Sequence, residues 1–465
     1  MSTPLTSSQG TLRPMFRLAL PVLAEQSLNV LVFYTDWWLL GHFLVGDDFK
    51  AAMGQMGYTL WLLSSLFAAA AIGATALVAR YVGAGDYRTA NRAANQAILT
   101  GAVIAVVATA AAVILGGQFF VLMRLEPGPA RLASQYLSIL TPAIPAIMMQ
   151  EVGTACLHGA GDTLTGFLIK LVVNLINIAV SASLVIGLGP LPALGWTGLA
   201  IGTACGHGLG GLLLMIVLVR GRAGLRIAWR QLWPDPHMIR RLLRIGLPGG
   251  VDMLAVLTCH LIYVAIINSL GTVAAAAHGL GVQIEALAYL PGYAFQVAAA
   301  TMAGQYLGGG DPRRATRGVL ATLAVGGSLV TGVGVFFFFG GHLLTTFFLG
   351  DPADPTGVLT ARLLRVVALS LPSQAIATVL TGALRGAGDT FWPLVITFIG
   401  FVMVRIPGAC LLAWHEIPIP GTGIVLTGFG LGVMGAWWAM VADTVVRSVL
   451  VALRFWQGKW RKVVV

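Results

Sequence analysis

The stretch Leu157-His158-Gly159-Ala160-Gly161-Asp162-Thr163 returns 227 residues later as Leu384-Arg385-Gly386-Ala387-Gly388-Asp389-Thr390. Two further pairs occur in the same order, at offsets of 225 and 227: Arg80-Tyr81-Val82-Gly83-Ala84-Gly85-Asp86 with Gln305-Tyr306-Leu307-Gly308-Gly309-Gly310-Asp311, and Leu18-Ala19-Leu20-Pro21 with Ile245-Gly246-Leu247-Pro248. Three ordered matches at nearly one offset indicate that the chain consists of two halves with the same fold.

The composition indicates that most of the protein surface does not face water. Of 465 residues, 57% are hydrophobic and only 10% are charged, with a mean hydropathy of +0.86. Soluble proteins carry about 25% charged residues. The chain is therefore an integral membrane protein, which excludes a soluble enzyme, a disordered protein and a secreted disulfide scaffold. The four cysteines lie far apart in apolar runs and predict free core thiols: Cys156, Cys205, Cys259 and Cys410.

A membrane-spanning helix needs about 20 mostly apolar residues. Twelve stretches qualify, near 14–40, 51–80, 92–119, 132–156, 164–188, 196–219, 240–269, 273–303, 316–340, 359–384, 391–414 and 432–456. We predict an all-α polytopic protein with an N-terminal six-helix lobe (1–220), a cytoplasmic basic linker (221–239) and a C-terminal six-helix lobe (240–465). Both halves then start on the same side of the membrane, so the repeat is parallel and the lobes meet at a central interface.

The basic residues predict the orientation. If both termini lie on one side, that side holds 21 of the 28 Lys and Arg residues and the opposite side holds 5. Loops that stay in the cytoplasm carry such an excess. The protein is therefore expected in the inner (cytoplasmic) membrane, with both termini and the linker in the cytoplasm. The net charge of +11 needs no nucleic-acid partner. Contact of the linker with anionic headgroups is an alternative reading of the same charges.

Two motifs carry a resemblance to a known family. Tyr34-Thr35-Asp36-Trp37-Trp38-Leu39-Leu40-Gly41-His42 in the first span and Gly382-Ala383-Leu384-Arg385-Gly386-Ala387-Gly388-Asp389-Thr390 after the tenth resemble segments of the multidrug and toxic compound extrusion (MATE) family. The resemblance covers essentially the whole chain. It implies cation-coupled efflux of drugs or metabolites by two lobes that open alternately.

Six carboxylates fall inside predicted spans: Glu25, Asp36, Glu151, Asp252, Glu285 and Asp443. A charge at mid-membrane costs at least about 2.5–3.5 kcal/mol on insertion scales, so each should face a cavity, a partner or the protein interior. A structural contact between helices is the alternative for each of them. For Asp443, a pair with Arg447 four residues later is the expected contact.

The resemblance implies that Asp36 binds the coupling cation, H⁺ or Na⁺. Asn177 and Ser181 occupy the place where many family members carry Asn-x-x-x-Asp, so serine replaces an acid here. Asn174 lies on the same helix face and Thr203 adds a hydroxyl, while helix–helix hydrogen bonding is the alternative role for the amides. A lone carboxylate with neutral neighbours favours H⁺, because protonation neutralises it in one step.

Four further charged residues are candidates for the substrate cavity: Glu25, Asp252, Glu285 and Arg405. Glu25 and Asp252 are related by the repeat, whereas the offset of 227 sends Asp36 to Tyr263. A coupling site is thus expected in the N-terminal half alone. Arg405 is also a candidate partner for one of the acids, with snorkelling or packing between the lobes as the alternative.

The predicted function is export of amphiphilic organic cations by a monomeric cation-coupled antiporter in the lipid bilayer. No enzymatic activity, cofactor or metal is expected, since the sequence has no H-E-x-x-H or paired-cysteine motif. A flippase for lipids or lipid-linked oligosaccharides is the closest rival, although only Lys170 and Arg405 supply basic residues within spans. A membrane-embedded hydrolase or transferase would need a clustered nucleophile and base.

Overall fold

The computed structural model describes residues 10–44, 46–188, 191–418 and 425–463. The first half contains α1 (Leu12–Phe43), α2 (Asp47–Gly83), α3 (Tyr87–Leu122), α4 (Pro127–Leu140), the 3₁₀ turn η2 (Thr141–Ala143), α5 (Ile144–Gly159), α6 (Thr163–Ile186), α7 (Trp196–Arg220) and the 3₁₀ turn η3 (Trp229–Gln231). The second half contains α8 (Pro236–Asn268), α9 (Thr272–Gly308), α10 (Pro312–Leu349), α11 (Pro355–Ala368), α12 (Leu371–Gly386), α13 (Phe391–Phe398), the π-helical η4 (Ile399–Arg405), α14 (Ile406–Ala413), α15 (Gly432–Trp456) and the 3₁₀ turn η5 (Lys459–Lys462).

The predicted all-helical membrane fold is confirmed. In the described ranges, eleven helical segments are long and apolar enough to cross a membrane, and a twelfth forms if α11 and α12 count as one span. These two helices meet at an angle of 55°, and Pro372 at the start of α12 has no N–H to continue the α11 ladder. A short antiparallel hairpin, β1 (Glu416–Pro418) with β2 (Val425–Thr427), was not predicted.

The repeated Gly-Asp motif is a turn between helices. In each of its four copies a glycine takes a positive φ, between 76° and 89°: Gly85, Gly161, Gly310 and Gly388. In three copies the aspartate that follows accepts a hydrogen bond from a backbone N–H of the next helix: Asp86, Asp162 and Asp311. Such an aspartate caps the helix. Hydrogen bonds from the Thr89 side chain and N–H hold the pKa of Asp86 below its ordinary value. The motif thus fixes where one span ends and the next begins.

The linker is shorter than predicted, because α8 begins at Pro236 instead of residue 240. Asp235 caps this helix, with its Oδ1 accepting from the N–H groups of His237 at 3.1 Å and Met238 at 3.3 Å. Proline at the first helical position suits this start, since its missing N–H would have no partner there. The structured linker therefore covers residues 221–235.

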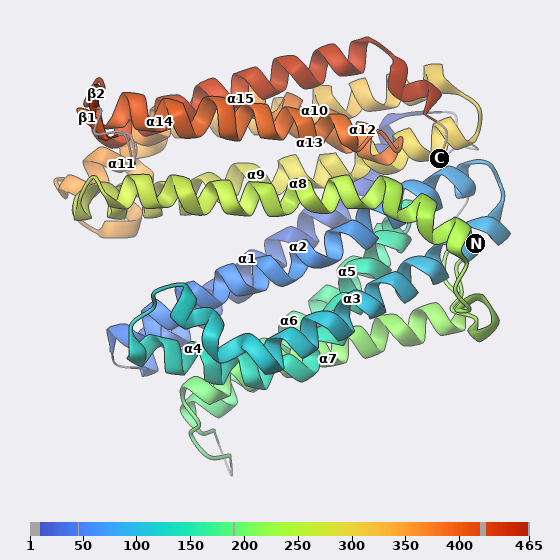
Figure 1. Cartoon of the computed structure of the whole chain (residues 1–465), viewed down its shortest axis with the longest axis horizontal. Coiled ribbons are helices and arrows are strands. Elements are labelled where there is room, and N and C mark those ends of the chain that lie inside the picture. The colour runs from blue at the N-terminus through green and yellow to red at the C-terminus, as the bar shows by residue number, and fades with distance from the viewer. Residues whose placement is uncertain (1–9, 45, 189–190, 419–424, 464–465) are drawn as a thin grey trace.

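Figure 1 shows the helices of the first half in one group and α8 to α15 in another. The two groups meet at the end where α1 begins and α15 ends and diverge toward the end with α4 and the β1–β2 hairpin. Met15 and Leu18 of α1 pack in one buried cluster with Phe455 and Trp460 near the end of the chain. The extreme ends, 1–9 and 464–465, lie outside the described residues, so the predicted cytoplasmic location of the termini stays a prediction.

The seam between the groups is built on close backbone contacts. A Cβ atom on Gly83 would collide with the backbone of Gln305, and one on Gly308 would collide with that of Arg80. Across the same seam, the Gln305 side chain donates to the carbonyl of Gly159 at 2.9 Å, and the Thr301 hydroxyl donates to that of His158 at 2.9 Å. Glycine at these positions lets α2 and α9 approach, which closes this end of the molecule.

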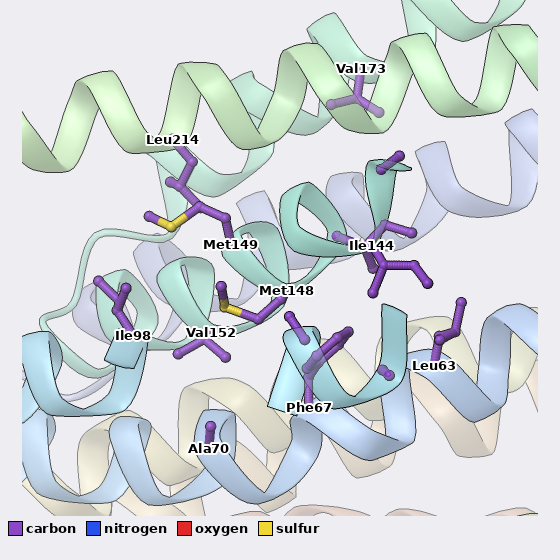
Figure 2. Close-up of a cluster of buried hydrophobic side chains, with 14 of the residues drawn as sticks. Leu63, Phe67, Ala70, Ile98, Ile144, Met148, Met149, Val152, Val173 and Leu214 are labelled. Carbon is purple, nitrogen blue, oxygen red and sulfur yellow. The ribbon is translucent and has the colours of Figure 1, made fainter. Parts of the chain in front are cut away.

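The core of the first group fixes the helices around the candidate site. Figure 2 shows side chains of α2, α3, α5, α6 and α7 gathered in this core, among them Phe67, Met148 and Val152. Gly101 of α3 leaves room for this packing, because a Cβ there would lie 2.8 Å from the sulfur of Met148. The tight packing holds α5 against α2 and α3, next to the two cavities described below.

Candidate functional site

A cavity inside the first group of helices gathers most of the residues predicted for cation coupling. Its volume is about 610 Å³, and Asp36, Asn174, Asn177 and Thr203 line its wall. Asp36 is buried, with 4% of its surface exposed. Ser181 is fully buried behind this wall, against α7. The structure therefore brings together α1, α6 and α7 at the predicted place.

Two glycines of α7 bring it close to the polar face of α6. Gly202 lies directly against Ser181, and a Cβ on Gly206 would lie 3.1 Å from the Cβ of Asn177. Small residues at such positions let membrane helices approach closely. The Asn177 side chain donates a hydrogen bond to the Thr203 hydroxyl of α7 at 3.2 Å. The glycines thus place the α6 amides within reach of the α7 hydroxyl.

Several polar atoms around this cavity have no hydrogen-bond partner among the described residues. They are Asp36 Oδ1, Asn174 Nδ2, Asn177 Oδ1 and Ser181 Oγ. Most buried polar atoms in proteins are paired, so a cluster of unpaired ones calls for an explanation. A carboxylate together with amide and hydroxyl oxygens can take up a proton or coordinate a small hard cation. This arrangement is suited to reversible cation binding.

Tyr136 of α4 belongs to the same site, although the sequence did not single it out. Its hydroxyl and that of Thr203 are hydrogen-bonded at 2.8 Å, and Tyr136 also lines the cavity. It lies within electrostatic reach of Asp36. No motif marks this tyrosine, because its contact with α7 depends on the tertiary packing of two distant helices.

If a cation binds in this cavity, replacing Tyr136 with phenylalanine should weaken its binding about twofold to tenfold. The change removes one hydrogen bond to Thr203, and a single such bond contributes roughly 0.5–1.5 kcal/mol. The cation concentration that gives half-maximal binding to the purified protein measures the effect. Tyr58→Phe is the matched control, since Tyr58 lines the same cavity. Equal half-maximal concentrations in both variants would contradict a role for Tyr136.

A polar stripe on α6 connects this cavity to a second one. Lys170, Asn174, Asn177 and Ser181 recur at steps of three or four residues, so they share one helix face. Lys170 and Glu151 line both cavities. The spacing is visible in the sequence and could have identified Lys170 as a member of the site.

The second cavity lies between the two groups of helices and has a volume of about 450 Å³. From the first group, Glu25 and His158 contribute a pair with 3.5 Å between Oε2 and Nε2. Glu151 accepts a hydrogen bond from Ser64 at 3.3 Å. From the second group, α12 contributes Arg385. This central cavity therefore carries charged groups of both signs.

Of the four residues predicted for the substrate cavity, only Glu25 lies in the described walls of either cavity. Asp252 is buried behind the central cavity, where it forms an ion pair with Arg385. Glu285 and Arg405 are buried within the second group of helices. A charge in a low-dielectric interior is stabilised by an opposite charge, which draws Asp252 and Arg405 toward ion partners instead of open space.

Arg405 belongs to a buried network of three charges. Its Nη2 lies 2.6 Å from Oδ2 of Asp443, and Nε of Arg447 lies 2.8 Å from Oδ1 of the same carboxylate. The guanidinium of Arg405 stacks over Phe401, 4.3 Å from the ring centre. The expected pairs of Asp443 with Arg447 and of Arg405 with an acid are both confirmed. Arg405 is the last residue of the π-helical segment η4. This segment lies in the repeat counterpart of α6, and because a π-helical turn contains more residues than an α-helical turn, it rotates the helix face relative to that of α6.

The family model described as MatE matches residues 21–182 and 248–411, one segment in each half. Among curated proteins, a probable multidrug resistance protein NorM of Thermotoga maritima is 28% identical over 460 residues, which cover 97% of this chain and 93% of the relative. A probable multidrug resistance protein NorM of Bradyrhizobium diazoefficiens is 29% identical, with 94% and 92% covered.

Solved structures share the fold at lower sequence identity. A MOP superfamily transporter from Pyrococcus furiosus, described as having a binding pocket of reverse polarity, has a TM-score of 0.87 at 18% identity. A multidrug resistance MATE family transporter in an outward-facing conformation has a TM-score of 0.84 at 18% identity. In both comparisons 97% of each chain is covered.

Proposed function

Because the chain belongs to the MATE family of multidrug efflux transporters, we propose that it exports amphiphilic organic cations in exchange for a coupling cation that binds at Asp36. The observation that carries the proposal is the cavity where the Asp36 carboxylate meets unpaired polar atoms of Asn174 and Asn177. H⁺ is the proposed coupling ion. Of the two carboxylates that the described residues place in this wall, Asp36 is buried, while Glu151 also opens to the central cavity. The proposed site therefore has one buried carboxylate, whereas Na⁺ requires several converging oxygens.

The charges of the central cavity support a cationic substrate. Glu25, Glu151 and the buried Asp252 face two cationic groups, Lys170 and Arg385. One negative charge remains when His158 is neutral. The wall also contains aromatic and flexible apolar side chains that can cover an amphiphile: Trp61, Tyr293 and Met253.

In this proposal, the two lobes (residues 1–220 and 240–465) alternate between two conformations during transport. The coupling cation biases the equilibrium by its different affinity for the two states. Lys170 and Glu151 line both the Asp36 cavity and the central cavity. Through these two residues, a change of charge at Asp36 alters the electrostatic environment of the bound substrate. The protein works as a monomer in this scheme, since both cavities lie within one chain.

The proposed location is the inner (cytoplasmic) membrane with both termini in the cytoplasm. The 21-to-5 distribution of Lys and Arg supports this orientation. The glycine-rich seam then closes the cytoplasmic end, and the state described here is outward-facing.

Transport of a fluorescent organic cation into proteoliposomes tests the proposal under separate H⁺ and Na⁺ gradients. We expect uphill movement of the dye under a pH gradient and little under a Na⁺ gradient of equal size. Uphill transport driven by Na⁺ alone would contradict the assignment of H⁺. Translocation of a labelled lipid headgroup, without transport of the dye under either gradient, would favour a flippase instead.

A further inference from the structure

The linker at residues 221–235 is a fixed element, held on α3 by side-chain amides. Asn95 donates to the carbonyl of Arg226 at 2.9 Å and accepts from the N–H of Ala228 at 3.0 Å. Gln96 donates to the carbonyls of Gln231 at 2.6 Å and Trp233 at 2.9 Å. An ion pair of 2.8 Å between Arg92 of α3 and Asp235 adds to this attachment. The linker therefore has a defined position on the first group of helices.

That position is on the lipid-facing side of α3. Arg92, Asn95, Leu99, Val103 and Val106 follow one another at steps of three or four residues, so they lie on one helix face. Val103 and Val106 are 58% and 67% exposed in a helix that spans the membrane, so they face acyl chains. Asn95 precedes Val103 by eight residues, or about 12 Å along the helix. The linker consequently lies where the hydrocarbon core gives way to the headgroup layer.

Two tryptophans of the linker point away from the protein at this level. Trp229 is 87% exposed and Trp233 is 79% exposed. Trp229 begins the 3₁₀ turn Trp229–Gln231, and Trp233 follows this turn by two residues and is held through its carbonyl by Gln96. Tryptophan is enriched where a membrane protein meets the headgroups, because its ring is apolar and its N–H is polar. Because both rings are exposed, neither contributes to packing within the chain, and the headgroup layer suits them better than water.

Exposed arginines lie before, between and after the tryptophans along the chain and give this segment a positive charge: Arg226, Arg230 and Arg240. Basic residues next to a membrane attract anionic lipids, each with roughly a fivefold increase in binding. We propose that the linker surface formed by Trp229, Trp233, Arg230 and Arg240 binds anionic phospholipid headgroups of the adjoining leaflet. None of these residues lines either cavity, so the inference does not depend on the transported substrate.

Tryptophan fluorescence of the full-length protein in vesicles tests this surface. The emission of wild type minus that of the Trp229→Phe/Trp233→Phe variant isolates the two linker tryptophans. The vesicles contain phosphatidylcholine and phosphatidylglycerol, with bromine atoms high on the acyl chains of one lipid at a time. We expect brominated phosphatidylglycerol to quench the isolated emission more strongly than brominated phosphatidylcholine at equal bromine content, by more than the roughly fivefold preference that a single arginine would give.

The Arg230→Gln/Arg240→Gln variant should lose this preference, and quenching by the two lipids should become nearly equal. Arg362→Gln/Arg365→Gln is the matched control, because it removes two exposed arginines from α11 near the opposite end. This control should keep the preference. Emission that neither lipid quenches would show that the tryptophans face water or a soluble protein, and would overturn the proposal. Equal quenching of wild type by both lipids would overturn the selectivity for anionic headgroups.

Discussion

Gradient-driven transport should fall to the level of protein-free vesicles when Asp36 is replaced by asparagine. The amide has nearly the shape of the carboxylate, so the buried site keeps its packing, but it cannot take up a proton or supply a negative charge. The loss therefore appears in uphill transport under a pH gradient, which proteoliposomes measure. Folding and passive substrate binding should remain close to wild type, because the central cavity does not include Asp36.

The matched control for this prediction is Asp47→Asn, which removes an exposed carboxylate at the start of α2 that pairs with Lys50. It should transport like wild type. Unimpaired uphill transport by Asp36→Asn would reject the assignment of Asp36. Attention would then shift to the carboxylates of Glu25, Asp252 and Glu285.

Replacing Asp443 with asparagine should destabilise the protein by about 3–5 kcal/mol. The carboxylate is fully buried between Arg405 and Arg447, and its loss leaves two buried guanidinium groups without their shared counter-charge. A decrease of roughly 10 °C in the thermal unfolding midpoint of the purified protein is the expected result. An unchanged midpoint would show that another anion neutralises the pair, with Glu285 as the candidate because it interacts electrostatically with Arg405.

A compensated variant separates charge from packing in this network. The triple change Asp443→Leu/Arg405→Met/Arg447→Met replaces all three charges with apolar side chains of similar size. Such replacements are often neutral for stability, so its midpoint should lie near that of wild type. If the triple variant is as unstable as Asp443→Asn, the network contributes through its specific geometry instead of through charge balance.

The sequence predicted the spans well, because membrane helices need long apolar stretches that few other structures require. It missed the π-helical segment before Ile406 and the β1–β2 hairpin. These features depend on local backbone geometry and on packing against neighbours. The start of α8 was placed four residues late, since the cap by Asp235 counts for more than hydropathy at that position.

The candidate coupling site was predicted in part, and the missing members share a cause. Asp36 and Asn177 could be named because motifs mark them. Tyr136 enters through a contact between α4 and α7 that no local pattern encodes. Conversely, Asp252 is a charged residue inside a span that pairs with Arg385 and does not line the cavity. Charge within a span indicates a function or a partner, and only the fold decides between them.

A coupling site built on the single carboxylate of Asp36 also limits how far the substrate can be concentrated. If one proton is exchanged for one singly charged cation, no net charge crosses the bilayer, so the membrane potential contributes nothing to the driving force. Each unit of pH difference then supplies about 1.4 kcal/mol, which corresponds to a tenfold ratio of concentrations. The substrate gradient at steady state can thus reach about tenfold per pH unit, however tightly the substrate binds.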